Sequence, residues 1–270
     1  MSELVLTIDL GNSAGKLRLW RVPGPGGAAP ECVRRGEIQG NAELPERLAA
    51  WIAAEGGAAP GRAVLASVAA PALERRVARA IAGCVGALVI GPPAGLANRC
   101  RSPESTGADR LYAARGALAV VGRSAIVVDA GTALTVDAVR ALPARAAEGA
   151  GELLGGAIAP GPALCARALA EGTARLPRVE PRPGVPALGR ETAEAIRAGL
   201  GIGFRGAARE LAREVAREAG LEGAPVVLTG GASSFLLEPG PFVPGELVRE
   251  PDLVHRGLLA ALLAGRGAAQ

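Results

Sequence analysis

The sequence contains few of the residues that build metal sites and disulfide frameworks. Its four cysteines, Cys32, Cys84, Cys100 and Cys165, are widely spaced, and no Cys-x-x-Cys pair occurs. Zinc sites and disulfide scaffolds need several Cys or His side chains at short spacings, so neither is predicted. We expect a protein of the reducing cytosol. For His255, the only histidine, we expect a surface or capping role.

Aromatic side chains and long apolar runs are also scarce. Three Phe, two Trp and one Tyr offer little surface for stacking on bases, and Glu alternates with Arg through residues 205–222. The net charge of +4 therefore does not predict a nucleic-acid partner. The longest uncharged runs, residues 153–166 and 83–98, are broken by Gly and Pro and are shorter than the roughly 20 residues of a membrane-spanning helix. We expect no membrane span and find no stretch like a secretory signal.

Lysine and aspartate are rare in a chain that is otherwise rich in charge. Lys16 is the only lysine among 30 basic residues, and only five of the 26 acidic residues are aspartate. Three of these, Asp9, Asp109 and Asp129, lie next to glycine motifs. A short carboxylate beside flexible backbone is typical of a binding turn, so these three positions are the first candidates for chemistry.

Two units with the same pattern open the two halves of the chain. Residues 4–9 form an apolar strand that leads into Gly11, and residues 126–129 repeat this order ahead of Gly131. Each unit continues into a second β-rich segment and so predicts a hairpin with a polar turn. Unless the pair arose by chance, two such units about 120 residues apart indicate a duplicated α/β domain.

Periodicity predicts the remaining elements. Helices are expected over residues 43–55, 71–82, 107–121, 163–171, 190–220 and 253–263, and buried strands over residues 63–69, 87–90, 124–129 and 226–229. We expect the halves to be residues 1–122, with the first polar turn and Asp109, and residues 123–270, with two further glycine turns.

The turn after the first strand contains the groups that a polyphosphate needs. It reads Asp9-Leu10-Gly11-Asn12-Ser13-Ala14-Gly15-Lys16. Glycine permits close approach, backbone amides bind oxygens, and Asp9 can hold Mg²⁺ directly or through water. Lys16 is interpreted either as a phosphate ligand or as a solvated strand residue. Alone, the motif is equally consistent with a structural turn.

Three further motifs strengthen the phosphate hypothesis. A second hairpin, Asp129-Ala-Gly-Thr132, can grip a phosphate chain from the other side, and Thr229-Gly230-Gly231-Ala232 offers a close backbone surface for adenine and ribose. Gly107-Ala108-Asp109-Arg110 opens a helix, where free N–H groups favour anions. This motif is either a helix start with a solvated arginine or a base beside an anion clamp, which phosphoryl transfer requires.

Seven motifs in order carry a resemblance to a known family. They are Asp9-Leu-Gly-Asn-Ser, Gly107-Ala-Asp-Arg110, Asp129-Ala-Gly-Thr-Ala, Gly155-Gly-Ala-Ile-Ala-Pro-Gly161, Thr173-Ala-Arg-Leu-Pro177, Thr192-x-x-Ala-Ile-x-x-Gly199 and Thr229-Gly-Gly231. Together they resemble type III pantothenate kinase, of the acetate and sugar kinase, Hsp70 and actin superfamily. The resemblance implies duplicated actin-like (ribonuclease H-like) domains with mixed β-sheets flanked by helices and an ATP cleft between them.

The resemblance also implies an activity and residue roles. The activity is ATP-dependent phosphorylation of pantothenate to 4′-phosphopantothenate, the first step of coenzyme A biosynthesis. Asp109 is then the general base. Pantothenate is bound by Cys100, Gly107, Ala108, Asp109, Arg110 and Thr192; ATP with Mg²⁺ is bound by residues 9–16, Thr132, Gly230 and Gly231; and Asp129 holds a monovalent cation, K⁺ or NH₄⁺. The family implies a homodimer.

The chain departs from the family pattern ahead of Asp109. The family usually has Gly-Thr-Lys/Arg-Thr-Gly and then a substrate-contacting tyrosine, whereas this chain has Gly91-Pro-Pro-Ala-Gly95 and Cys100. The change removes a phenol, a basic residue and two hydroxyls. Two alternatives therefore stay open: a kinase of the same superfamily for another small hydroxylated acid, and a catalytically weak nucleotide-binding regulatory protein. The presence of Asp109 argues against the second.

Overall fold

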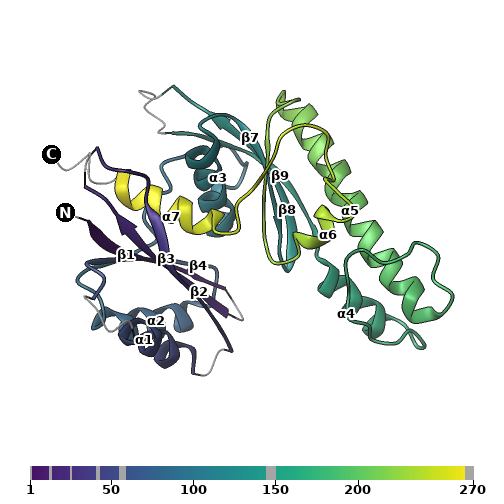
Figure 1. Cartoon of the computed structure of the whole chain (residues 1–270), viewed down its shortest axis with the longest axis horizontal. Coiled ribbons are helices and arrows are strands. Elements are labelled where there is room, and N and C mark those ends of the chain that lie inside the picture. Colours follow the sequence, from purple (N-terminus) through teal and green to yellow (C-terminus); the bar gives the residue numbers. More distant parts are fainter. Residues whose placement is uncertain are drawn as a thin grey trace. The chain divides into compact units, whose positions relative to one another are not determined.

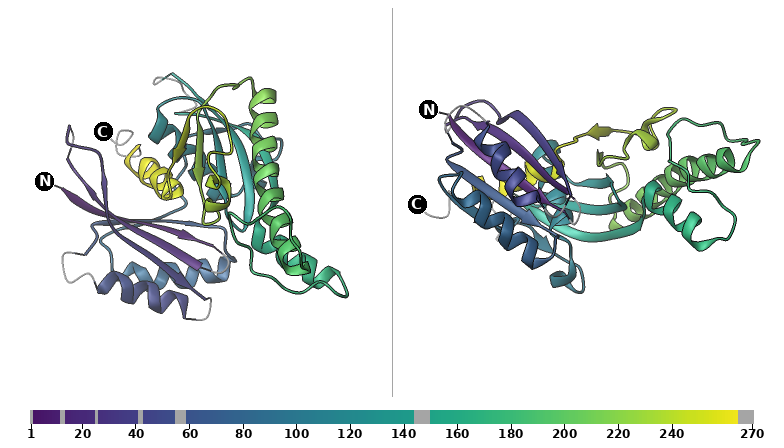
Figure 2. Two further views of the ribbon diagram at one scale, coloured as in Figure 1. Left: turned by 45° about the vertical axis from the view of Figure 1, so that its right-hand side comes forward. Right: turned by 90° about the horizontal axis from the view of Figure 1, so that it is seen from below.

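The computed structural model describes residues 2–11, 14–24, 26–40, 43–54, 59–143 and 150–264. The chain forms two compact units (Figures 1 and 2). Unit 1 comprises Met1–Leu96, Glu104–Ala119 and Val254–Gln270, and unit 2 comprises Ala97–Pro103 and Val120–Leu253. Each unit contains one mixed sheet flanked by helices.

Unit 1 is built on a five-stranded sheet with the order β3-β2-β1-β4-β5. The strands are β1 (Glu3–Leu10), β2 (Ala14–Val22), β3 (Glu31–Gln39), β4 (Arg62–Ser67) and β5 (Leu88–Ile90). The first three are antiparallel neighbours, while β4 is parallel to β1 and β5 is parallel to β4. The helices are α1 (Leu44–Ala53), α2 (Pro71–Ala82), most of α3 (Ala108–Val121) and α7 (Leu253–Ala264).

Alternation along β1 separates the core of unit 1 from its polar face. Leu6, Ile8 and Leu10 are fully buried with residues of α1 and α2, whereas Thr7 and Asp9 point to the opposite face, as the period of two requires. On that opposite face lies α7, shown in yellow in Figure 2. The polar ends of β1 and β2 are therefore fixed by a core on one side of the sheet and a helix on the other.

Unit 2 repeats this topology with one strand added. Its order is β11-β10-β7-β8-β9-β6, from β6 (Ala97–Asn98), β7 (Ala125–Ala130), β8 (Ala133–Ala141), β9 (Gly151–Pro160), β10 (Val226–Thr229) and β11 (Leu247–Arg249). The strands β7, β8 and β9 are antiparallel, β10 and β11 continue in parallel from β7, and β6 is parallel to β9. The predicted α/β chain with two mixed sheets flanked by helices is thus confirmed.

Helices of unit 2 cover one face of this sheet. The unit contains α4 (Pro162–Gly172), α5 (Thr192–Ala219), α6 (Ser234–Leu237) and a 3₁₀ turn, η1 (Pro103–Ser105), that leads out of it. Phe204, Ala208 and Ala212 of α5 pack on the apolar face of β7 and β8. None of the helices in the described ranges is both long and apolar enough to cross a bilayer.

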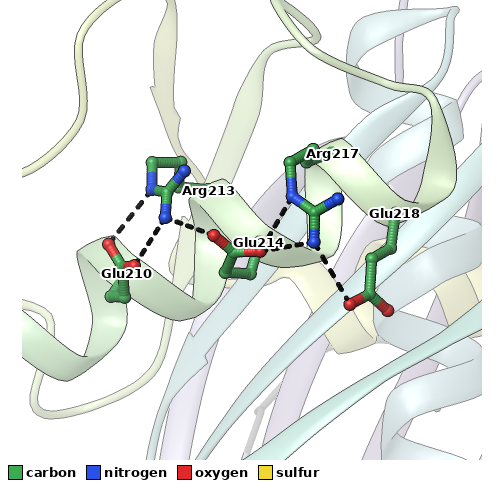
Figure 3. A network of polar contacts seen from close by, with 5 residues as sticks. All are labelled: Glu210, Arg213, Glu214, Arg217 and Glu218. Atoms are coloured by element: carbon green, nitrogen blue, oxygen red, sulfur yellow. Dashed lines mark hydrogen bonds and ion pairs between the residues drawn. The ribbon is translucent and has the colours of Figure 1, made fainter.

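The outer side of α5 carries a chain of ion pairs (Figure 3). Arg213 bridges Glu210, at 2.6 Å, and Glu214. Arg217 bridges Glu214, at 2.7 Å, and Glu218, at 3.5 Å. Exposed pairs of this kind contribute little to the stability of the fold, because water screens the charges. The alternation of Glu and Arg in the sequence is therefore explained by neutralisation along the helix.

Candidate active site

The first polar turn joins β1 to β2 in unit 1. Asp9 lies directly opposite Lys16 across the hairpin, and Gly11 N donates a hydrogen bond to Ala14 O at 2.9 Å. Gly15 lets the hairpin lie close to α1, because a Cβ at this position would approach Leu48 to 3.2 Å. Of the predicted nucleotide-binding residues, Asn12 and Ser13 lie outside the described residues. In the described part of this turn, the carboxylate of Asp9 and the ammonium of Lys16 come from residues that lie opposite each other.

The environment of Asp9 opposes its negative charge. Burial raises the pKa of the Asp9 carboxyl to about 6, an effect that the positive charge of Lys16 partly offsets. The charge of Asp109 raises this pKa further, and that of Arg18 lowers it. Lys16 and Asp109 are thus both close enough to Asp9 in unit 1 to act electrostatically on it. A carboxylate that is destabilised in this way gains from a bound cation.

Asp109 lies in the first turn of α3, where the sequence predicted it. Its Oδ1 accepts a hydrogen bond from Arg110 N at 2.9 Å. A Cβ at residue 107 would overlap this same carboxylate oxygen, so Gly107 provides the space that it occupies. Gly107, Ala108, Asp109 and Arg110 are all partly buried. The backbone N–H groups of this turn and the Arg110 guanidinium are suited to an anionic ligand.

The second and third turns meet in unit 2. Gly131 N donates to Ala133 O at 3.0 Å, so the β7–β8 turn is also closed by a glycine N–H but is one residue shorter than the β1–β2 turn. Thr229 of β10 lies beside Asp129 of β7. Gly230, with a φ of 95°, follows Thr229, and a Cβ there would overlap the carbonyl of Ala130 and approach Asp129 Oδ1.

Thr132 is tied to the same cluster of turns. Its carbonyl accepts a hydrogen bond from Gly161 N at 3.0 Å, at the end of β9. Ala232 N donates to Ala130 O at 2.7 Å, which holds the Gly230–Gly231 turn against the end of β7. The structure therefore brings the turn of Asp129 and Thr132 and the turn of Gly230 and Gly231 together at the end of β7.

Two other predicted substrate residues lie on separate elements of unit 2. Thr192 is the first residue of α5 and is exposed. Cys100 follows β6 and is partly buried; its backbone N donates to Asn98 Oδ1 at 3.1 Å. Both residues therefore belong to the unit that also contains Asp129 and Thr132.

The carboxylate and carbonyl oxygens of the candidate site suit hard cations that bind together with the phosphates of a substrate. Within the part of the chain that the structure describes, no three His, Cys, Asp or Glu side chains gather as a metal cage. Mg²⁺ in phosphoryl-transfer sites is usually held by one or two carboxylates together with substrate phosphates and water. Asp9 in unit 1 fits this requirement. Asp129 lies beside the carbonyl-rich turns of unit 2, whose oxygen atoms are ligands that hard cations prefer.

Tyr112 is a residue of the site region that the sequence analysis missed. It lies in α3 three residues after Asp109, and its hydroxyl donates to the carbonyl of Pro92 at 2.5 Å. Burial raises the pKa of this phenol to about 12, so it remains a donor. Tyr112 thereby ties the helix of the candidate base to the 91–95 loop. No signal in the sequence links these two positions, which lie 20 residues apart.

The expected surface or capping role of His255 is wrong. The residue is 2% exposed, and its Nδ1 lies 2.8 Å from Thr7 Oγ1, which also accepts a hydrogen bond from Trp20 Nε1 at 2.9 Å. This buried polar group fixes α7 on β1 and β2. The spacing of His255 with Leu258, Leu259 and Leu262 in one helix could have indicated a buried face.

Comparisons with known proteins identify the family. The family model described as type III pantothenate kinase matches residues 5–214. The type III pantothenate kinase of Halorhodospira halophila is 41% identical over 265 residues, covering 94% of this chain and 96% of that protein. A protein of the same name from Thermus thermophilus is 37% identical over 267 residues, covering 98% of this chain and 100% of that protein.

Solved structures show weaker likeness. A glucokinase from an Antarctic psychrotroph is 15% identical, with a TM-score of 0.49 and coverage of 97% of this chain and 99% of that one. An archaeal actin homologue is 12% identical, with a TM-score of 0.47 and the same coverage of both chains. Because both TM-scores are below 0.5, these two likenesses carry no argument about the fold, which the sheet topology of the chain itself defines. The match of the family model and the near full-length relatives show that the chain belongs to the type III pantothenate kinase family.

Proposed function

We propose that this protein transfers the γ-phosphoryl group of ATP to the terminal hydroxyl of pantothenate, giving 4′-phosphopantothenate, the first step of coenzyme A biosynthesis. Family membership supports this function. The observation that carries it is the cluster of Asp9, Lys16 and Asp109 in unit 1. A carboxylate suited to Mg²⁺, an ammonium for phosphate and a second carboxylate for a proton are the parts that phosphoryl transfer requires.

In the proposed mechanism Asp109 is the general base. It accepts the proton of the pantothenate hydroxyl while that oxygen bonds to the γ-phosphorus, and the bond from the γ-phosphorus to the bridging oxygen breaks to release ADP. The N–H groups at the start of α3 and the Arg110 side chain bind the acceptor. Asp9 would hold Mg²⁺, which neutralises charge on the phosphates, and Lys16 neutralises more of it.

The other predicted ligands have supporting roles in this proposal. The turn of residues 9–16, Thr132, Gly230 and Gly231 bind ATP, and Thr192 and Cys100 contact pantothenate. Asp129 holds K⁺ or NH₄⁺ near the second phosphate turn. Along the chain, residues 1–122 supply the first phosphate turn and the base, and residues 123–270 supply the second phosphate turn and the adenosine turn.

The test is the rate of ADP release with Mg-ATP and pantothenate, with and without K⁺ or NH₄⁺. Asp109→Asn should lower kcat by about 10²-fold or more, because a general base contributes typically this much, while ATP binding measured by calorimetry stays near that of the wild type. Glu104→Gln removes a nearby exposed carboxylate and serves as the control. A near wild-type kcat in Asp109→Asn would remove Asp109 from the reaction.

A different small hydroxylated acid is the second candidate acceptor. It is favoured by the 91–95 loop, which has neither a hydroxyl nor a basic side chain, and by Cys100 in the expected place of a tyrosine. A panel of such acids, assayed at saturating ATP, separates the two. Pantothenate should give the highest kcat/KM, and a higher value for another acid would assign the alternative.

We further propose that the protein is a cytosolic homodimer. Three large apolar side chains of unit 2 are exposed: Ile158 (63%), Leu188 (77%) and Ile202 (51%). Exposed apolar side chains mark a contact surface where they form one patch, so the proposed dimer would have to bury them together. All four cysteines are free thiols, which suits a reducing compartment. Light scattering should give twice the chain mass of 26.9 kDa, and a mass of one chain would contradict the dimer.

A further inference from the structure

A single asparagine side chain closes the turn that carries Cys100. Asn98 Oδ1 accepts a hydrogen bond from Cys100 N at 3.1 Å, and Asn98 Nδ2 donates to Pro103 O at 3.2 Å. We refer to residues 98–103 as the Cys100 turn. Side-chain amides that bond to nearby backbone groups commonly organise turns of this kind. Both ends of the Cys100 turn are thus fixed by Asn98.

The Cys100 turn is attached to β9 through Arg99. Arg99 N donates to Leu153 O at 2.9 Å, and Arg99 Nε and Nη2 lie 2.7 and 2.6 Å from Glu152 Oε1. Glu152 is 8% exposed. Its other oxygen lies 3.4 Å from Arg140 Nη1, on β8, which has no part in the turn. Arg99 therefore provides the short contacts to a nearly buried carboxylate.

Backbone pairing alone is a weak attachment for this segment. The strand β6 has two residues and pairs only with Glu152 and Leu153 at the edge of the sheet. A charge-assisted contact to a nearly buried carboxylate is stronger than an exposed ion pair, and removing one partner leaves the other charge poorly compensated. The Arg99–Glu152 pair therefore adds a side-chain constraint on where the Cys100 turn lies.

We infer that Arg99, Glu152 and Asn98 are positioning residues that hold the Cys100 turn in the geometry that selects the acid acceptor. This inference rests on the proposed function, in which Cys100 contacts the acceptor. The inference extends the proposed function, because three side chains that need not touch the acceptor would then control the KM for that acceptor. The turn leads through η1 into Gly107 and the start of α3, so the same constraint acts on the chain just ahead of the candidate base.

The experiment compares Arg99→Met with the matched control Arg140→Met. Both remove one guanidinium next to Glu152, but only Arg99→Met releases the turn. Alkylation of Cys100 by iodoacetamide, followed by peptide mass spectrometry, should be several-fold faster in Arg99→Met and in Asn98→Ala, and near wild type in Arg140→Met. The KM for pantothenate should rise about tenfold in Arg99→Met, equivalent to about 1.4 kcal/mol, with kcat and the KM for ATP changed little. Arg99→Lys should recover part of this loss.

Two results would overturn the inference. One is equal Cys100 alkylation in Arg99→Met and Arg140→Met, which would mean that the pair does not hold the turn. The other is faster alkylation with an unchanged KM for pantothenate, which would mean that the turn does not select the acceptor. Alkylation requires no turnover. If the wild-type protein phosphorylated no acid, the proposed function would fail, while the alkylation rates would still decide whether Arg99 holds the turn.

Discussion

At the scale of single residues, Asp9 shows how the candidate site opposes the stability of the fold. Its carboxyl has a pKa of about 6, against a usual value of 3.8, because burial penalises the charged form more than Lys16 stabilises it. At neutral pH the folded protein therefore carries a charge that the unfolded chain would solvate better. A buried carboxylate whose charge lowers the free energy of unfolding is expected at a site where a bound cation offsets that charge.

Asp9→Asn should therefore stabilise the metal-free protein while it removes activity. Because the folded state binds the proton more tightly than the unfolded state, Asp9 lowers the free energy of unfolding progressively as the pH rises from about 4 to about 6, and the full cost remains above pH 6. At pH 7.5 the substitution should raise this free energy by about 3 kcal/mol, and at pH 4 by much less. Urea unfolding in EDTA at both pH values measures the difference.

An exposed carboxylate provides the control for Asp9→Asn. Glu31 of β3 is exposed and pairs with Arg21 at the surface. Glu31→Gln should change the free energy of unfolding by less than about 0.5 kcal/mol at either pH. If Asp9→Asn were destabilising at pH 7.5, the charge of Asp9 would be satisfied by the protein itself, and the argument for a cation there would lose its basis.

Short-range patterns predicted the polar turns of the candidate site but not the contacts that support them. The sequence predicted the hairpin that joins the strands of Asp9 and Lys16, and its loop length brings these two residues opposite each other. Asp109 lies in the first turn of the helix that was predicted to begin at Gly107. The bond from Tyr112 to Pro92 depends on tertiary packing that no spacing shows. Local sequence determines where the turns form, whereas the tertiary contacts that hold the turns in place depend on which surfaces pack together in the fold.

At the scale of elements, the six longer helices were predicted within a few residues, whereas the short helix α6 and the four strands β3, β6, β9 and β11 were missed. The strand β9 runs from Gly151 to Pro160, through a segment in which the sequence analysis saw only glycine turns. Gly155, with a φ of 129°, lies next to an irregularity in the pairing with β8. A Cβ on Gly156 would overlap Val136 O. These glycines allow a close strand contact, and their composition alone suggests a turn.

The packing of α7 on α3 depends on one glycine. A Cβ at Gly257 would overlap the carbonyl of Tyr112 and lie 3.0 Å from Gly116 N, so backbone on both sides would have to move. Gly257→Ala should lower the free energy of unfolding by about 3 kcal/mol, because overpacking at backbone contacts is relieved poorly. Since α3 carries Asp109, kcat should fall as well. Thermal unfolding and the ADP-release assay measure the two effects.

A glycine in an open position of another helix is the matched control. A Cβ added to Gly203 of α5 would have no neighbouring atom within 4 Å, so Gly203→Ala gains helix propensity of up to about 1 kcal/mol without a clash. Opposite signs for the two substitutions would establish that the contact at Gly257 is the cause. A stabilising Gly257→Ala would show that α3 and α7 are not in close contact.

At the scale of the whole molecule, the two sheets share one strand order although the chain does not divide cleanly between the units. The strands β3-β2-β1-β4-β5 of unit 1 correspond in order and direction to β9-β8-β7-β10-β11 of unit 2. Yet unit 1 takes in α7 from the far end of the chain, and unit 2 takes in residues 97–103. Repeated motifs revealed the duplication, but a helix that returns to the first sheet leaves no local signature.

Because α7 packs within unit 1, it should unfold with β1 and β2 and not with its sequence neighbours β10 and β11. In hydrogen exchange followed by mass spectrometry, Gly257→Ala should speed exchange in β1, β2 and α7 and leave unit 2 near wild type. Phe204→Ala, which removes a side chain buried on β7 and β8, should do the reverse. This crossed pattern is expected because cooperative units open together and follow contacts, not sequence. If α7 followed unit 2 in both variants, His255 and its bond to Thr7 would contribute little to holding the chain end on the first sheet, and the last helix would belong energetically to the second half.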